Sequence, residues 1–143
     1  ASIKGTVSQL LDYDIEVEDT ASAYIKLENK ANGVFFATNA NFGNSSVELQ
    51  IIFENEKFTI KDNILTRFNE AGEKIKIGED EKMTGNKTYY EPSHGKLINA
   101  FYDCINNDSN NYVHPKDALT SIAMIDAIQK SSESLKTVQF DSI

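Results

Sequence analysis

Residues 20–28 read TASAYIKLE, and apolar and polar side chains alternate strictly along them. A period of two is typical of a β-strand with one buried face, because successive side chains point to opposite sides of a sheet. The apolar set would face the interior: Ala21, Ala23, Ile25 and Leu27. The segment NKANG at 29–33 follows and predicts a tight reversal, since Asn and Gly tolerate the positive φ that hairpins need.

The same alternation continues to about Ile77, with turn residues at short intervals. It predicts further strands at residues 2–9, 34–42, 46–53, 57–61, 63–68 and 73–77. In the strand at 34–42, we expect Val34, Phe36 and the residues two apart after them to point inward. The turns would be Asp62-Asn63 and the segment 69–72.

Beyond a polar segment at 78–92, which predicts a long surface loop, the pattern becomes helical. A helix capped by Ser93 would carry one apolar stripe, formed by Leu97, Ile98, Phe101, Cys104 and Ile105. A second helix should begin at Pro115 and end near Ser132. Its apolar residues cover more than one stripe, so we expect it to be buried on two sides. A short strand at 137–140 would return to the sheet.

These elements predict a single domain over residues 1–143 with an α+β fold, in which an open, mainly antiparallel sheet has helices packed on one face. The other face would carry apolar residues from neighbouring strands: Tyr24, Phe35, Ile52 and Leu65. Scattered surface apolar residues are normal. A contiguous patch would instead mark an interface, and we predict that these four residues form an oligomer contact.

Composition excludes several classes of function. The chain has 143 residues, of which 40% are hydrophobic and 25% charged, and no run approaches the ~18 apolar residues of a membrane span. The net charge is −8, and the lysines are spread along the chain beside the single arginine, Arg67, which argues against binding nucleic acid or anionic lipid. A single cysteine, Cys104, cannot form an internal disulfide, so a cytoplasmic protein is expected.

The sequence predicts no catalytic residue and offers one candidate for ligand contact, His94. No two glycines are spaced as Gly-x-Gly, which argues against a nucleotide fingerprint in this chain. The histidines, His94 and His114, lack further ligands at metal-site spacing, Cys104 lies on an apolar helix stripe, and the acidic run at 12–19 fits a solvated loop. His94 follows the long loop and could reach a ligand from the start of its helix, although spacing alone favours the simpler interpretation that it only occupies a helix N-terminus.

Three stretches show a resemblance that covers nearly the whole chain. The first comprises residues 17–23 and 27–33, and the second reads HGKLINAF at 94–101. The third runs from Ala118 through residues 127–128 to Ser131-Ser132 and residues 136–138. In order and spacing the chain resembles the C-terminal domain of the glucose-fructose oxidoreductase, inositol dehydrogenase and MocA (Gfo/Idh/MocA) family of NAD(P)-dependent oxidoreductases.

The resemblance implies an open sheet whose free face builds a dimer or tetramer. It also implies an N-terminal Rossmann domain with the Gly-rich cofactor loop, followed by a Glu-Lys-Pro motif and an Asp-x-x-x-His motif. The present sequence has no Lys-Pro dipeptide and no Asp four residues before a His. In related enzymes, residues near the position of His94 approach the substrate, which implies a substrate-binding role for His94 and for Tyr90.

Two functions therefore remain open. The first is the C-terminal domain of a bacterial NAD(P)-dependent sugar or polyol oxidoreductase, forming one wall of the substrate cleft and the oligomer interface. Such a domain would bind no cofactor or metal and would be inactive alone, because NAD or NADP would sit on the Rossmann domain. The alternative is a free-standing, non-catalytic module that binds a partner or sugar through the outer sheet face.

Overall fold

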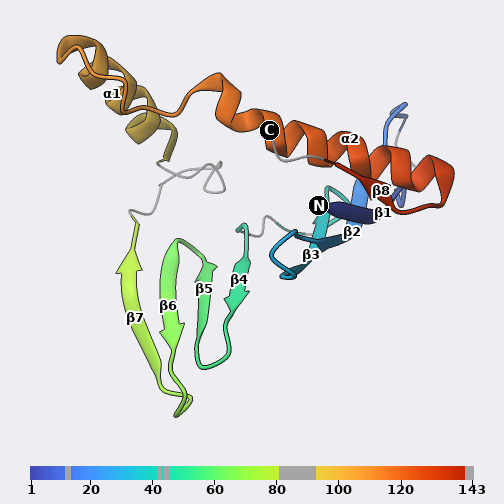
Figure 1. Cartoon of the computed structure of the whole chain (residues 1–143), viewed down its shortest axis with the longest axis horizontal. Helices are drawn as coiled ribbons and strands as arrows, with labels where there is room; N and C mark the ends of the chain where they lie inside the picture. The colour runs from blue at the N-terminus through green and yellow to red at the C-terminus, as the bar shows by residue number, and fades with distance from the viewer. Residues whose placement is uncertain (12–13, 42, 44–45, 81–92, 141–143) are drawn as a thin grey trace. The chain divides into compact units, whose positions relative to one another are not determined.

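The computed structural model describes residues 1–11, 14–41, 43, 46–80 and 93–140, and its strands and helices are labelled in Figure 1. The chain divides into two compact units, one formed by residues 1–42 and 113–143 and the other by residues 43–112. Antiparallel strands and two helices confirm the α+β class. The strands belong to two four-stranded sheets, whereas the sequence pattern predicted one.

The first unit holds a sheet in the order β3-β2-β1-β8 and a helix packed on it. Its elements are β1 (Ser2–Ser8), β2 (Thr20–Lys26), β3 (Asn32–Thr38), the 3₁₀ helix η1 (Pro115–Ala118), α2 (Leu119–Ser134) and β8 (Val138–Gln139). Every pairing is antiparallel. The predicted start at Pro115 is confirmed, although the first turn is 3₁₀, and the helix ends where Leu135 adopts a left-handed φ of 57°.

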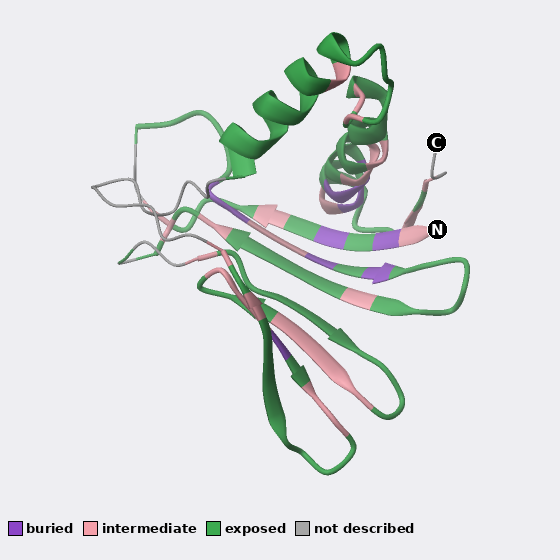
Figure 2. Ribbon diagram, turned by 90° about the vertical axis from the view of Figure 1, so that its left-hand side faces the viewer, coloured by how far each residue is buried: buried purple, intermediate pink, exposed green. Residues whose placement is uncertain are grey.

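The core of this unit lies between α2 and the two central strands. Ile3 is fully buried, and Ala23 and Ile25 from β2 pack with Ala127 and Ile128 from α2. Figure 2 shows the buried residues in purple on β1, β2 and the facing side of α2. The inward orientation predicted for Ala23 and Ile25 is therefore confirmed.

Two predictions about orientation in this unit are wrong. In β3, Gly33 lies opposite Ile25 and Phe35 lies opposite Ala23, so Phe35 shares the α2 side of the sheet, and Val34 and Phe36 point to the other side. The helix α2 is buried on one side only, since Ile122 and Ile125 are 59% and 64% exposed. A shift of one residue in the register reverses every side chain of a strand, which explains the first error.

The second unit contains a meander in the order β4-β5-β6-β7 and the helix α1. The elements are β4 (Leu49–Ile52), β5 (Lys57–Lys61), β6 (Ile64–Phe68), β7 (Lys74–Glu79) and α1 (Ser93–Asn106). The predicted turn at Asp62-Asn63 is confirmed, and both residues have positive φ, 51° and 62°. Such a turn suits the right-handed twist of the strands that it joins.

The helix α1 begins at Ser93, the residue predicted to cap it, but none of its described residues is buried. Leu97, Ile98 and Ile105 of the predicted apolar stripe are 46%, 54% and 57% exposed, and Cys104 is half-buried. Phe101 makes an edge-to-face contact with Tyr112, with ring centroids 5.1 Å apart. The stripe predicted from periodicity therefore exists, but the described residues do not cover it.

Asp19 is buried, with 5% of its surface exposed, whereas the other acidic residues of the 12–19 run that the structure describes are exposed. Its carboxylate accepts hydrogen bonds from the backbone N–H of Leu10 at 2.9 Å, the backbone N–H of Leu11 at 2.8 Å and the hydroxyl of Thr20 at 2.8 Å. The donors at Leu10 and Leu11 lower the pKa of the Asp19 carboxyl below 3.8, outweighing desolvation. The prediction of a solvated run is wrong for Asp19, which ties the loop to the start of β2.

We expect Gly5→Ala to destabilise the first unit by about 1–3 kcal/mol, as overpacking does. A Cβ at residue 5 would lie 3.0 Å from Cγ2 of Ile128 and 3.3 Å from its Cα. Urea unfolding followed by circular dichroism measures the change. Gly78→Ala in β7 is the matched control, because nothing lies within 4 Å of its added Cβ. Equal stability of the two variants would contradict this account of the core.

Asp19→Asn should lower stability at neutral pH, because the amide presents a donor where three donors converge. A carboxyl with a lowered pKa stabilises the fold fully above its unfolded pKa, and the contribution is lost as pH falls through the lower, folded-state value. The difference in urea midpoint between wild type and variant should therefore shrink at acidic pH, below 3.8. The exposed Glu16→Gln should follow wild type throughout. A difference that stays constant with pH would show that the Asp19 carboxylate is not responsible.

Candidate functional site

The second sheet presents an apolar face, which is the first candidate surface. Residues opposite one another in a register, and residues two apart along a strand, share a face of a sheet. The pairing Leu49–Ile60–Leu65 and the pairing Ile51–Phe58 place five apolar residues together. They line a shallow hollow of about 200 Å³. Leu49 and Ile51 are 49% and 47% exposed, so this face is more apolar than a sheet in water requires.

The four residues predicted to form one interface do not share a face. Tyr24 lies on the side of the first sheet that faces away from α2, and Phe35 lies on the α2 side. Ile52 and Leu65 belong to the second sheet, where Leu65 lines the apolar hollow and Ile52, beside Lys57, points to the opposite face. Within each sheet, strand register therefore puts the two predicted residues on opposite faces, and their role in an oligomer contact stays a prediction.

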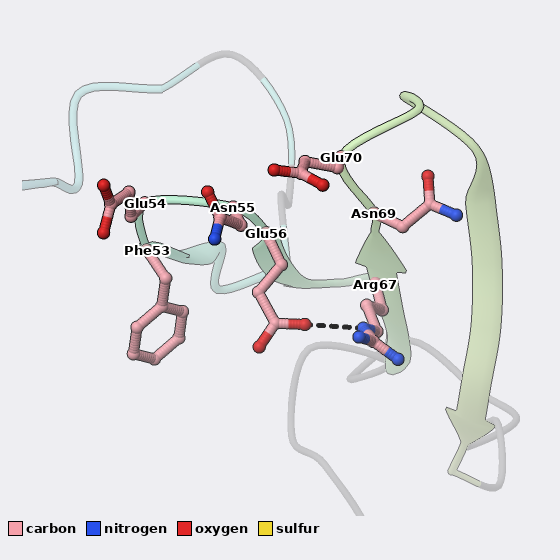
Figure 3. Close-up of a pocket in the computed structure, with 7 residues that line it drawn as sticks. All are labelled: Phe53, Glu54, Asn55, Glu56, Arg67, Asn69 and Glu70. Carbon is pink, nitrogen blue, oxygen red and sulfur yellow. Dashed lines mark hydrogen bonds and ion pairs between the residues drawn. The ribbon is translucent and has the colours of Figure 1, made fainter.

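A polar hollow of about 590 Å³ lies at the end of the second sheet where β4 joins β5 and β6 joins β7 (Figure 3). Its lining residues are Phe53, Glu54, Asn55, Glu56, Arg67, Asn69 and Glu70. Glu56 points toward Arg67, and Nε of Arg67 donates to its carboxylate at 2.6 Å. The phenyl ring of Phe53 packs edge-on against Phe58, with centroids 6.0 Å apart. Two further carboxylates beside a paired arginine leave the hollow acidic.

The described residues do not fit a nicotinamide dinucleotide. Its pyrophosphate binds where a Gly-rich turn opens a helix or where arginine is free to pair with phosphate. Among the described residues, the helix α1 opens on Ser93-His94-Gly95 without a Gly-x-Gly pair. Arg67, the sole arginine of the chain, is already paired with Glu56.

His94, the sequence candidate for substrate contact, is exposed in the first turn of α1. On the same helix, the ammonium group of Lys96 forms an ion pair with Asp80, which directly follows β7. The distance between Nζ and Oδ1 is 2.5 Å. Tyr90 lies outside the described residues. Among residues that are described, no group of three His, Cys, Asp or Glu side chains could hold a metal ion. The placement of His94 agrees with the predicted helix start, and its role stays a prediction.

The opposite face of the second sheet carries lysines, which sequence spacing did not reveal. The register aligns Lys57, Phe68 and Lys74 across β5, β6 and β7, with Lys61 and Lys76 on the same face. Lys61 donates to Glu48 at 2.9 Å, which raises the pKa of Lys61 and lowers the pKa of Glu48. The clustering follows from which residues stand opposite one another in neighbouring strands, so it can be recognised only when the strand pairing is known.

None of the described helices is long and apolar enough to cross a membrane. A comparison with curated proteins finds no match for the chain. A family model described as "Oxidoreductase family, C-terminal alpha/beta domain" (Gfo/Idh/MocA) matches residues 4–140.

Solved structures show the same fold. An oxidoreductase domain protein from Kribbella flavida superimposes with a TM-score of 0.80 at 16% identity, over 99% of this chain and 44% of that chain. An oxidoreductase from Agrobacterium radiobacter, in complex with NAD⁺, L-tartaric acid and magnesium, gives a TM-score of 0.77 at 13% identity, over 97% of this chain and 43% of that chain. Levoglucosan dehydrogenase in complex with NADH and L-sorbose gives a TM-score of 0.77 at 16% identity, over 99% of this chain and 45% of that chain.

The chain thus spans less than half the length of these structural relatives. The family model matches nearly every residue, and the fold agrees with it over the two units. The chain belongs to the Gfo/Idh/MocA family of oxidoreductases, of which it is a C-terminal α/β domain.

Proposed function

We propose that this chain is the C-terminal domain of an NAD(P)-dependent dehydrogenase that acts on a sugar or polyol. The observation that carries the proposal is the family match over residues 4–140. Relatives of the same fold include levoglucosan dehydrogenase bound to NADH, and a UDP-N-acetylglucosamine 3-dehydrogenase from Acidithiobacillus ferrooxidans. A bacterial, cytoplasmic enzyme is the expected setting and stays a prediction.

In this proposal the enzyme has two domains with different roles. An N-terminal Rossmann domain holds NAD or NADP, which accepts or gives the hydride at the carbinol carbon of the substrate. The present domain binds no cofactor alone and forms one wall of the substrate cleft, and His94 and Tyr90 are its proposed substrate-binding residues. The acidic hollow around Arg67 supports this division, because its carboxylates would repel a pyrophosphate.

The purified chain should neither bind NAD(H) or NADP(H) in a calorimetric titration nor turn either over with sugars or polyols. Coding sequence upstream in the same frame should encode a strand, a Gly-x-Gly-x-x-Gly loop and a helix. Turnover by the isolated chain would contradict the proposal. An in-frame stop codon upstream would instead favour the free-standing binding module.

In the full-length enzyme, His94→Ala should weaken substrate binding, raising KM roughly 2- to 10-fold, as expected for one lost hydrogen bond. Asn99→Ala, an exposed change on the same helix, is the matched control and should leave KM unchanged. Steady-state kinetics with the preferred sugar measures both. An unchanged KM for His94→Ala would remove this residue from the substrate cleft.

We also propose that the apolar face of the second sheet is a subunit contact. Leu49→Gln with Ile51→Gln should shift the assembly toward monomer in sedimentation velocity, because both side chains lose apolar burial. Val34→Gln is the control: it is 86% exposed and lies in the first unit. A wild-type chain that is monomeric at high concentration, or a double variant that assembles normally, would rule the contact out.

A further inference from the structure

The face of the second sheet opposite the apolar hollow gathers positive charge in an acidic protein. The chain carries 14 Lys and Arg against 22 Asp and Glu, for a net charge of −8. Four of its lysines, Lys57, Lys61, Lys74 and Lys76, nevertheless share this one face of β5–β7. We call this set the lysine face. Its sequence positions are scattered, and the strand pairing brings them together.

Two of the four lysines are not neutralised by a close carboxylate. Lys61 pairs with Glu48, and Lys76 pairs with Glu79. Lys57 and Lys74 form no ion pair with the described residues, and their ammonium groups instead lie 4.5 Å and 5.9 Å from the centroid of the Phe68 ring. The ring attracts both cations and limits their freedom, so they are held in place before any anion arrives.

The surroundings of this pair are apolar as well as cationic. Ile52 lies beside Lys57 in the register and is 73% exposed. Phe68 is half-buried between the two lysines. Small anions bind in concave sites, whereas an open sheet face with mixed charge and apolar area suits a protein surface. The complementary surface should therefore alternate carboxylates with apolar side chains.

The chain itself carries a segment of that kind in its first unit. Residues 14–18 read Asp-Ile-Glu-Val-Glu, and all five are exposed, with Ile15 at 41% and Val17 at 63%. Asp14, Glu16 and Glu18 form no ion pair with the described residues. The next residue, Asp19, accepts hydrogen bonds from the backbone N–H groups of Leu10 and Leu11 and so fixes the end of this segment. We call residues 14–18 the acidic segment.

We propose that the lysine face binds the acidic segment of a second copy of this chain. Lys57 and Lys74 pair with the carboxylates of Asp14 and Glu16, and Ile52 and Phe68 contact Ile15 and Val17. Opposite charges steer such a contact and fix its orientation, while the apolar pairs exclude water around it. The contact uses the face opposite the apolar hollow, so it does not depend on the proposed dehydrogenase function or on the apolar subunit contact.

The contact should be sensitive to salt, unlike the apolar contact, because ions screen exposed charges. In sedimentation velocity at about 50 mM salt, the wild-type chain should form a larger species than at about 500 mM. Lys57→Glu with Lys74→Glu should abolish that salt dependence and weaken the association at least about tenfold. A wild-type mass that does not respond to salt would overturn the proposal and leave the lysine face to another acidic partner.

A charge exchange separates this contact from a general effect of net charge. Asp14→Lys with Glu16→Lys should also weaken association when alone, and an equimolar mixture with the Lys57→Glu, Lys74→Glu variant should restore it. Lys26→Glu with Lys116→Glu is the control, because both lysines are exposed in the first unit and the net charge changes equally. Far-UV circular dichroism verifies folding of each variant. A mixture that fails to associate, or a control that behaves like Lys57→Glu with Lys74→Glu, would contradict the pairing.

Discussion

The contact between α2 and β1 is the interaction on which the first unit depends. Gly5 allows the helix to approach so closely that a Cβ would meet Ile128 at 3.0 Å. At that point the hydroxyl of Ser131, which is fully buried, accepts from the backbone N–H of Gly5 at 3.0 Å and donates to the carbonyl of Lys136 at 2.5 Å. One side chain thus satisfies backbone groups of the strand and of the turn that follows the helix, where an unpaired buried group would be costly.

This contact also determines how the ends of the chain meet. The strand β8 follows the turn after α2 and pairs with the start of β1, with Ser2 opposite Gln139. The backbone N–H of Phe140 donates to the carbonyl of Ala1 at 3.0 Å. Ser132 adds a second link from the helix, since its hydroxyl accepts from the backbone N–H of Val7 at 3.0 Å. Residues from both ends of the family match are therefore held in one sheet.

The second unit has a different physical character, since its sheet separates two chemistries by the alternation of side chains. One face is apolar around Leu49 and Ile60, and the other is cationic around Lys57 and Lys74. A two-faced sheet of this kind suits contacts on both sides.

Much of the fold was predictable from the sequence, because local periodicity and turn chemistry depend on neighbouring residues. The alternation at 20–26, the turn at Asp62-Asn63 and the start of the last helix segment at Pro115 all have such local causes, and the structure confirms them. The strand predicted to reach Glu28 ends at Lys26, and Leu27, predicted to face inward, is 44% exposed. The resemblance to the oxidoreductase family also rested on local stretches, and the family match confirms it. Tertiary structure alone decided which side of β3 faces α2, the burial of Asp19 and the gathering of four lysines on one face. These depend on strand register and on backbone donors brought together from distant residues, and a one-residue shift in register exchanges the two faces of a strand.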